Sequence, residues 1–241
     1  MNGGATDAFL VTCEHGGNRI PAPYRPLFER SRARLDSHRG YDFGALPVAR
    51  ALAAAFSAPL VASTVSRLLV DLNRSIGHPQ LFSAETRGLP ARLRSEIIDL
   101  YYRPYRTQVE RLVRRSVARG RRVVHVSSHS FTPVLNGDRR RADLGLLYHP
   151  GRSGESRLCA RWKDSLAAFA PGLRVRRNYP YAGKADGLTA YLRRRFPPGA
   201  YVGIELEVNQ DIVSAGGAQW RRLRGALVLS MFAACATGGP Q

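Results

Sequence analysis

Apolar residues along the chain form short runs that alternate with longer segments of helical periodicity. The runs are rich in β-branched residues and predict buried strands at residues 8–13, 59–65, 123–128 and 201–208, with a weaker one at 173–177. Helices are predicted at 45–56, 93–119, 156–169, 188–195 and 218–234, and Pro104 is expected to kink or divide the second of them. Strands that alternate with helices indicate an α/β fold with a mainly parallel or mixed central sheet.

The alternation also predicts how the chain is organised. It continues across two segments rich in glycine, proline and polar residues, 75–89 and 132–141, which are expected to be surface loops. We therefore expect one domain, residues 1–241, built as a three-layer α/β/α sandwich of the phosphorylase/hydrolase-like kind. No apolar stretch is long enough to span a bilayer, and no basic segment precedes an apolar run near Met1, so the expected location is the cytoplasm.

Charge is the unusual feature of the composition. The 241 residues carry 37 Lys and Arg against 18 Asp and Glu, a formal net charge of +19. This excess suggests an anionic partner, but only Lys163 and Lys184 are lysines, and the arginines are scattered through helical segments. No zinc finger, helix-turn-helix signature or aromatic-rich RNA motif accompanies them, so an arginine-rich solvated surface is the preferred interpretation. A basic nucleic-acid-binding protein stays open as an alternative.

Chemistry-bearing residues gather where the predicted strands end. Ligands of open α/β sheets bind outside the carboxyl ends of the strands. Four separate strands deliver polar side chains to that edge: Glu14-His15-Gly16-Gly17-Asn18, Ser66-Arg67 with Asp71-Leu72-Asn73-Arg74, His129, and Glu205 with Glu207. Two histidines and a carboxylate form a common catalytic zinc set, which makes His15 and His129 candidate metal ligands.

The third ligand is open between two carboxylates. Glu14 directly precedes His15, and neighbouring side chains in extended backbone point apart, so joint ligation by both is awkward. Asp42, just before a predicted helix, is favoured, although an aspartate there also suits a helix N-cap.

Two further groups at this edge suit chemistry beside a bound metal ion. Glu205 and Glu207 share one strand face, and a carboxylate on an apolar strand costs free energy unless it is paired or used. Glu207 is the candidate general base, with an arginine salt bridge as the structural alternative. Arg67 and Arg74, with Asn73 between them, can hold a carboxylate, or Asp71 can pair with one of them. A cysteine nucleophile at Cys13 is less favoured, because buried cysteine usually packs as a small apolar residue.

At these residues the sequence resembles the N-formylglutamate amidohydrolase family, whose wider kin include aspartoacylase and the zinc carboxypeptidases. The resemblance runs from about Val11 to Gln210. It rests on an ordered set of motifs: Glu14-His15-Gly16-Gly17 with Ile20-Pro21, Asp42, Ser66-Arg67, Asp71-Leu72-Asn73-Arg74, Tyr102-Arg103-Pro104-Tyr105, Ser128-His129-Ser130 and Glu205-Leu206-Glu207.

The resemblance implies a zinc-dependent amidohydrolase that acts on linear amides, similar to N-formylglutamate deformylase. His15, His129 and Asp42 would bind one Zn²⁺, with Glu14 as the alternative third ligand. Arg67, Asn73 and Arg74 would hold the carboxylate or scissile carbonyl of a small N-acyl amino acid, and Arg67 would also act in catalysis. Glu207 would take a proton from zinc-activated water. A metallopeptidase or cell-wall amidase on the same scaffold is the alternative within this class.

Overall fold

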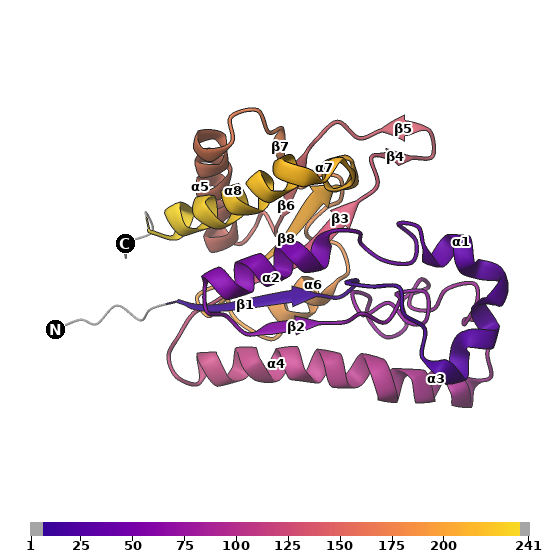
Figure 1. The fold of residues 1–241 in the computed structure, drawn as a ribbon. Coiled ribbons are helices and arrows are strands. Elements are labelled where there is room, and N and C mark those ends of the chain that lie inside the picture. The colour runs from indigo at the N-terminus through magenta and orange to yellow at the C-terminus, as the bar shows by residue number, and fades with distance from the viewer. Residues whose placement is uncertain (1–6, 237–241) are drawn as a thin grey trace.

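A six-stranded mixed sheet forms the centre of the molecule (Figure 1). The computed structural model describes residues 7–236. The strands lie in the order β2 (Leu60–Ala62), β1 (Ala8–Cys13), β3 (Val123–Phe131), β8 (Tyr201–Asn209), β6 (Leu144–Leu147) and β7 (Val175–Arg177). The first four are parallel, β6 runs antiparallel to β8, and β7 runs parallel to β6. The predicted α/β class with a mainly parallel, mixed sheet is confirmed.

Helices cover both faces of this sheet (Figure 1). One apolar core contains buried side chains of α2 (Ala45–Ala55), α5 (Ser153–Phe169) and α8 (Gly217–Ala236). A second core contains those of α4 (Arg103–Val117) and α6 (Leu188–Arg193), together with the shorter helices η1 (Ala22–Ser31), α1 (Arg32–Leu35) and α3 (Ala91–Ile97). The three layers are therefore helices, sheet and helices. No helix within residues 7–236 is both long and apolar enough to cross a membrane.

Side-chain alternation in β8 explains how polar groups enter this interior. Its residues Val202, Ile204, Leu206 and Val208 pack into the core beneath α2, α5 and α8. Successive side chains of a strand point to opposite faces, so Glu205 and Glu207 lie on the other face, toward α4 and α6. The expected shared face of the two glutamates is confirmed, and His125, Ser127 and His129 of β3 lie on the same side of the sheet.

Several predicted elements differ from the observed ones. Strand β2 is shorter than residues 59–65, while β3 continues past 128 to Phe131 and so includes His129. Strand β6 was not predicted, because its four residues contain a glycine and follow a polar loop. The predicted loop at 132–141 contains a hairpin, β4 (Val134–Leu135) and β5 (Asp138–Arg139). Its turn residues Asn136 and Gly137 have φ values of 51° and 86°, and Asn-Gly is a strong hairpin signal.

The helical segment around Pro104 is divided, as expected, but by a change of helix type. Helix α3 is followed by a π-helical turn, η2 (Ile98–Tyr102), and α4 begins at Arg103. Proline has no N–H to donate to the carbonyl four residues earlier, so a regular α-helical ladder cannot pass through this point. A short helix after β8, α7 (Gln210–Ala215), was also not predicted.

Candidate metal centre

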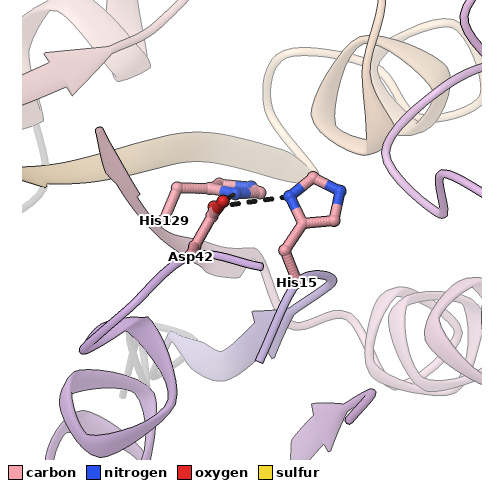
Figure 2. Close-up of side chains that lie close together, drawn as sticks. All are labelled: His15, Asp42 and His129. Carbon is pink, nitrogen blue, oxygen red and sulfur yellow. Dashed lines mark hydrogen bonds and ion pairs between the residues drawn. The ribbon is translucent and has the colours of Figure 1, made fainter. Parts of the chain in front are cut away.

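His15, Asp42 and His129 come together at the carboxyl ends of the strands (Figure 2). His15 follows β1, His129 lies near the end of β3, and Asp42 precedes α2. One ligand atom from each of the three buried side chains lies within 4.8 Å of the other two. Asp42 Oδ2 lies 3.3 Å from His15 Nδ1 and 2.8 Å from His129 Nδ1. The two histidines therefore present the same ring nitrogen to one carboxylate.

The backbone explains why Asp42 reaches this point. Its N–H donates to the carbonyl of His15 at 2.9 Å, which fixes the two residues side by side. Helix α2 has Gly44 at its N-cap and no side-chain cap, so the carboxylate of Asp42 does not cap the helix. Its second oxygen, Oδ1, lies 3.5 Å from Arg67 Nη1.

The outer nitrogens of both histidines have carboxylate partners. His15 Nε2 lies 2.7 Å from Asp71 Oδ1, and His129 Nε2 lies 3.0 Å from Glu14 Oε2 and 2.9 Å from Ser127 Oγ. A carboxylate on the far nitrogen of a ligating histidine fixes the ring orientation and raises its basicity. Glu14 thus lies on the far side of His129 from Asp42, and the group of converging ligand atoms does not include it.

These ion pairs keep the buried acids ionised. Burial alone raises carboxyl pKa values, but the charges and hydrogen bonds of neighbouring imidazoles outweigh it at Asp42 and Glu14. At Asp71 the guanidinium of Arg67 and the ring of His15 do the same, so the pKa values of all three acids lie well below their usual range. Burial lowers the pKa of His129, but Asp42 and Glu14 more than offset this and raise it well above normal. Three ionised carboxylates therefore surround the two histidines.

Arg67 connects the two carboxylates that contact His15. Its Nη2 lies 2.7 Å from Asp71 Oδ2, in addition to the contact of Nη1 with Asp42. The side chain is 27% exposed, so the guanidinium forms part of the accessible wall of the centre. The expected ion pair between Arg67 and Asp71 is present, and Asp71 also contacts His15 of the candidate metal centre.

Glu207 lies beside the centre without a partner of its own. It pairs in register with His129 across β3 and β8, and its residue exposure is 5%. Its Oε2 is buried and has no hydrogen-bond partner in the described structure. Burial, together with the negative charges of Asp42 and Glu205, raises the pKa of Glu207 to about 8, although the charge of His129 acts in the opposite direction. The arginine salt bridge considered for it is not formed.

Asn73 and Arg74 follow Asp71 in the same turn of the chain, and both contact the segment around the start of α6. Asn73 Oδ1 accepts from the backbone N–H of Leu188, and Arg74 Nη1 donates to the carbonyl of Asp186 at 3.0 Å. Asp186 in turn accepts from the N–H and hydroxyl of Ser75. The structure therefore gives Asn73 a partner at the first residue of α6 and Arg74 a partner in the loop before that helix.

Two other titratable side chains of β1 and β3 have different environments. His125 lies between Thr12 Oγ1 and the hydroxyl of Tyr201, and burial lowers its pKa to about 4. The thiol of Cys13 is fully buried, and burial with the nearby charges of Glu14 and Asp42 raises its pKa well above normal. A thiol in that environment is a poor nucleophile.

Sequence reasoning missed three parts of the centre. The contact of Asp71 with His15 was not predicted, nor were the hydrogen bonds that Ser127 and Tyr105 donate to Glu14. Ser127 could have been found, because it stands two residues before His129 and so shares its strand face. Tyr105 stands on a distant helix, and only its place in a family motif pointed to it.

A model of the N-formylglutamate amidohydrolase family matches residues 7–214, which include the whole centre. The chain belongs to the N-formylglutamate amidohydrolase family. The crystal structure of a gene product from Agrobacterium tumefaciens is 33% identical, with a TM-score of 0.81 over 97% of this chain and 92% of that one.

A second similar structure carries the family's name. It is the N-formylglutamate amidohydrolase from Ralstonia eutropha, 19% identical, with a TM-score of 0.70 over 98% of this chain and 95% of that one. At that identity the likeness supports the fold of this family member. No match to a curated protein sequence was found.

Proposed function

We propose that this family member is a zinc-dependent amidohydrolase that cleaves the amide bond of a small N-acyl amino acid such as N-formylglutamate. The observation that carries the proposal is the convergence of His15 Nδ1, His129 Nδ1 and Asp42 on one point, beside a buried carboxylate without a hydrogen-bond partner, Glu207. Family membership supports hydrolysis of an amide, and the geometry supports a metal-assisted route.

The donor set fits a zinc ion. Two imidazole nitrogens and one carboxylate oxygen, each backed by a second group, are a typical catalytic zinc set with a position left for substrate. His15, Asp42 and His129 would hold the ion. When bound, it would supply a Lewis acid that polarises the amide carbonyl and makes water more acidic.

Glu207 has the properties of a general base. A base must accept a proton near neutral pH, and burial has already brought the pKa of Glu207 up to about 8 in the protein without metal. A cation in the neighbouring centre would lower that pKa and favour the carboxylate. The free Oε2 can then take a proton from the attacking water and pass it to the leaving amine.

Arg67 is the proposed donor to the substrate oxygen. Each of its two terminal nitrogens holds a carboxylate, which fixes the plane of the guanidinium, and the side chain is still partly accessible. A fixed donor at a developing oxyanion contributes about 10²–10³ in rate in other enzymes.

Several cations lie near Asp42, and they support a carboxylate-bearing substrate. Beside Asp42, burial lowers the pKa of His38, and the cations of Arg39, Arg140 and Arg67 lower it further. Arg140 lies past the ends of β3 and β8: its guanidinium is 5.9 Å from the ring of Phe131, and its carbonyl accepts from Asn209. Asn73 and Arg74 stay proposed contributors to the same anion site.

Hydrolysis of a substrate panel tests this function. Zinc-loaded protein is assayed on N-formyl and N-acetyl amino acids, on their carboxamides and on short peptides. We expect hydrolysis of an N-acyl amino acid with a free carboxylate, and a loss of about 10²–10⁴ in kcat in Glu207→Gln with zinc retained. Glu205→Gln, on the same strand face, is the matched control. Activity on peptides or cell-wall fragments alone, or an active Glu207→Gln, would contradict the proposal.

A further inference from the structure

Three side chains from one helical face reach the groups that hold the two histidines. Tyr102, at the end of η2, and Tyr105 and Arg106, in the first turn of α4, are spaced i, i+3 and i+4 and so share a face. All three are buried. We call them the α4 clamp. In Figure 1, α4 lies beneath β1 and β2, on the face of the sheet opposite α2.

The first contact of the clamp leads to His129. The hydroxyl of Tyr105 donates to Glu14 Oε1 at 2.8 Å and also lies 3.0 Å from the carbonyl of Val61. Glu14 Oε2 is the atom that faces His129 Nε2. Tyr105 and Ser127 therefore hold the two oxygens of one fully buried carboxylate, and this fixes the side from which the carboxylate approaches the imidazole.

The other two contacts lead to His15. Arg106 Nη1 donates to the carbonyl of Leu72 at 3.0 Å, and the Tyr102 hydroxyl donates to the carbonyl of Arg74 at 2.7 Å. These carbonyls belong to the turn that begins at Asp71, the carboxylate on His15 Nε2. The turn is thus held from α4 at two points, one and three residues after Asp71.

The buried guanidinium of Arg106 makes one hydrogen bond in the described structure, the one to Leu72. The residue is 4% exposed, and its Nε and Nη2 make no hydrogen bond in the described structure. Its guanidinium lies over the rings of Tyr191 and Tyr102, at 4.2 and 5.3 Å from their centroids. The two rings hold the guanidinium in place by cation–π contact. Its hydrogen bond in the described structure goes to the turn that carries Asp71.

We propose that the α4 clamp sets the metal affinity of the centre, because it fixes the two carboxylates that orient the metal-binding histidines. Tyr105 acts through Glu14 on His129, and Tyr102 and Arg106 act through the 71–74 turn on His15. These are positioning residues, and none of them is a metal ligand. The inference rests on the proposed function only in requiring that the centre binds a metal ion.

The test measures Zn²⁺ affinity with a competing chelator, and separately the free energy of unfolding of the metal-free protein. Loss of a group that supports a metal ligand typically costs about 10–100-fold in affinity. We expect Tyr105→Phe and Tyr102→Phe each to weaken Zn²⁺ binding about tenfold. The matched control is Tyr101→Phe on the same helix, whose ring packs edge-on against Tyr24, and it should bind Zn²⁺ as the wild type does.

Double variants separate positioning from a general structural effect. If Tyr105 acts through Glu14, adding Tyr105→Phe to Glu14→Gln should cause little further loss of Zn²⁺ affinity, whereas adding it to Asp71→Asn should cause its full loss. Tyr102→Phe should show the opposite pattern.

Two results would overturn the inference. The first is a lower free energy of unfolding in Tyr105→Phe and Tyr102→Phe with unchanged Zn²⁺ affinity, and the second is additivity in every pair. A wild-type protein that binds no Zn²⁺ would overturn the metal-based function as well. Zinc binding without amide hydrolysis would contradict only the proposed substrate.

Discussion

At the scale of single residues, the histidines of the centre are held on both ring nitrogens. His15 lies between Asp42 and Asp71, and His129 lies between Asp42 and Glu14. Glu207 differs from these acids, because it is buried against the same cluster and has one oxygen without any partner. Placing a carboxylate in that environment costs stability whenever it is charged, and this cost has a measurable pH dependence.

The pH dependence of stability should change in Glu207→Gln. The pKa of an ordinary glutamate, as in the unfolded chain, is 4.5, and that of Glu207 in the folded, metal-free protein is about 8. Between these values the folded state binds more protons than the unfolded state, so this residue lowers wild-type stability as pH rises, by up to about 1.4 kcal/mol per pH unit. The variant lacks this contribution. The free energy of unfolding of Glu207→Gln, relative to that of the wild type, should therefore rise from about pH 4.5 and level off above about pH 8.

Urea unfolding of metal-free protein across that pH range measures the effect. Glu205→Gln should narrow this pH range without abolishing the effect, because the charge of Glu205 is one of the causes that raise the pKa of Glu207. Parallel stability profiles for wild type and Glu207→Gln would show that Glu207 titrates as an ordinary glutamate.

A second residue-scale prediction concerns recognition of a substrate carboxylate. Arg140 lies close enough to His38 to lower its pKa. Its Nη1 donates to the hydroxyl of Tyr181, and its guanidinium lies 5.1 Å from the centroid of that ring. Hydrogen bonds to charged groups contribute about 1.5–3 kcal/mol, so Arg140→Met should raise KM about 10–100-fold for an N-acyl amino acid. For the carboxamide of the same N-acyl amino acid, which lacks the carboxylate, the substitution should not raise KM. An equal effect on both compounds would argue against contact between Arg140 and the carboxylate.

At the scale of elements, strand β6 lies beside Glu207, and its backbone at Gly145 closely approaches the backbone at Tyr179. Gly145 in β6 pairs with Glu207 across the sheet. A Cβ at Gly145 would lie 1.9 Å from the carbonyl oxygen of Tyr179, and 3.2 Å from the Cβ of Glu207. Because the first clash is with backbone, a side-chain rotation cannot relieve it.

Gly145→Ala should therefore destabilise the fold and displace Glu207. Overpacking of an interior typically costs about 1–3 kcal/mol, and we expect at least that loss in the free energy of unfolding, with a lower kcat. Gly88→Ala is the matched control, because a Cβ there meets nothing within 4 Å. Denaturant unfolding compares the two. A Gly145→Ala protein as stable as Gly88→Ala would show that β6 and the 179 loop are not in close contact.

The elements also show how far the sequence alone could lead. Strands β1, β3 and β8 follow directly from runs of apolar residues, and the carboxyl ends of these three strands brought His15, His129 and Glu207 to one edge. The position of Asp71 against His15 could not be predicted, since it depends on how an irregular turn folds back over β1. Tyr105 reaches Glu14 from a helix 91 residues away in the chain, and no local pattern encodes that contact.

At the scale of the whole molecule, the net charge is +19, and ion pairs take up part of the positive side chains. Ion pairs such as Arg122 with Asp7 and Arg174 with Asp143 use part of the arginines on the surface. In the proposed function, the charge that bears on the chemistry is local, at Arg67 and Arg140. The prediction that nucleic acid is not a partner stays a prediction.

Zinc should stabilise the folded protein as a whole. A ligand that binds only the folded state adds about 2.7 kcal/mol at one hundred times its Kd. In a chain of this size each kcal/mol raises Tm by about 2–4 °C, so saturating Zn²⁺ should raise Tm by several degrees. The shift should vanish in His15→Ala with His129→Ala, and Mg²⁺ should not replace Zn²⁺. Calorimetry of the metal-free protein with each ion checks this, and an equal shift in the double variant would place the ion elsewhere.

The position of a bound zinc ion tests the central claim most directly. Anomalous diffraction at the zinc edge, from crystals of wild-type protein grown with Zn²⁺, locates the ion without reference to any assay. We predict one peak at about 2.0–2.2 Å from His15 Nδ1, His129 Nδ1 and a carboxylate oxygen of Asp42. No peak at these three side chains, or a peak elsewhere in the molecule, would contradict the account.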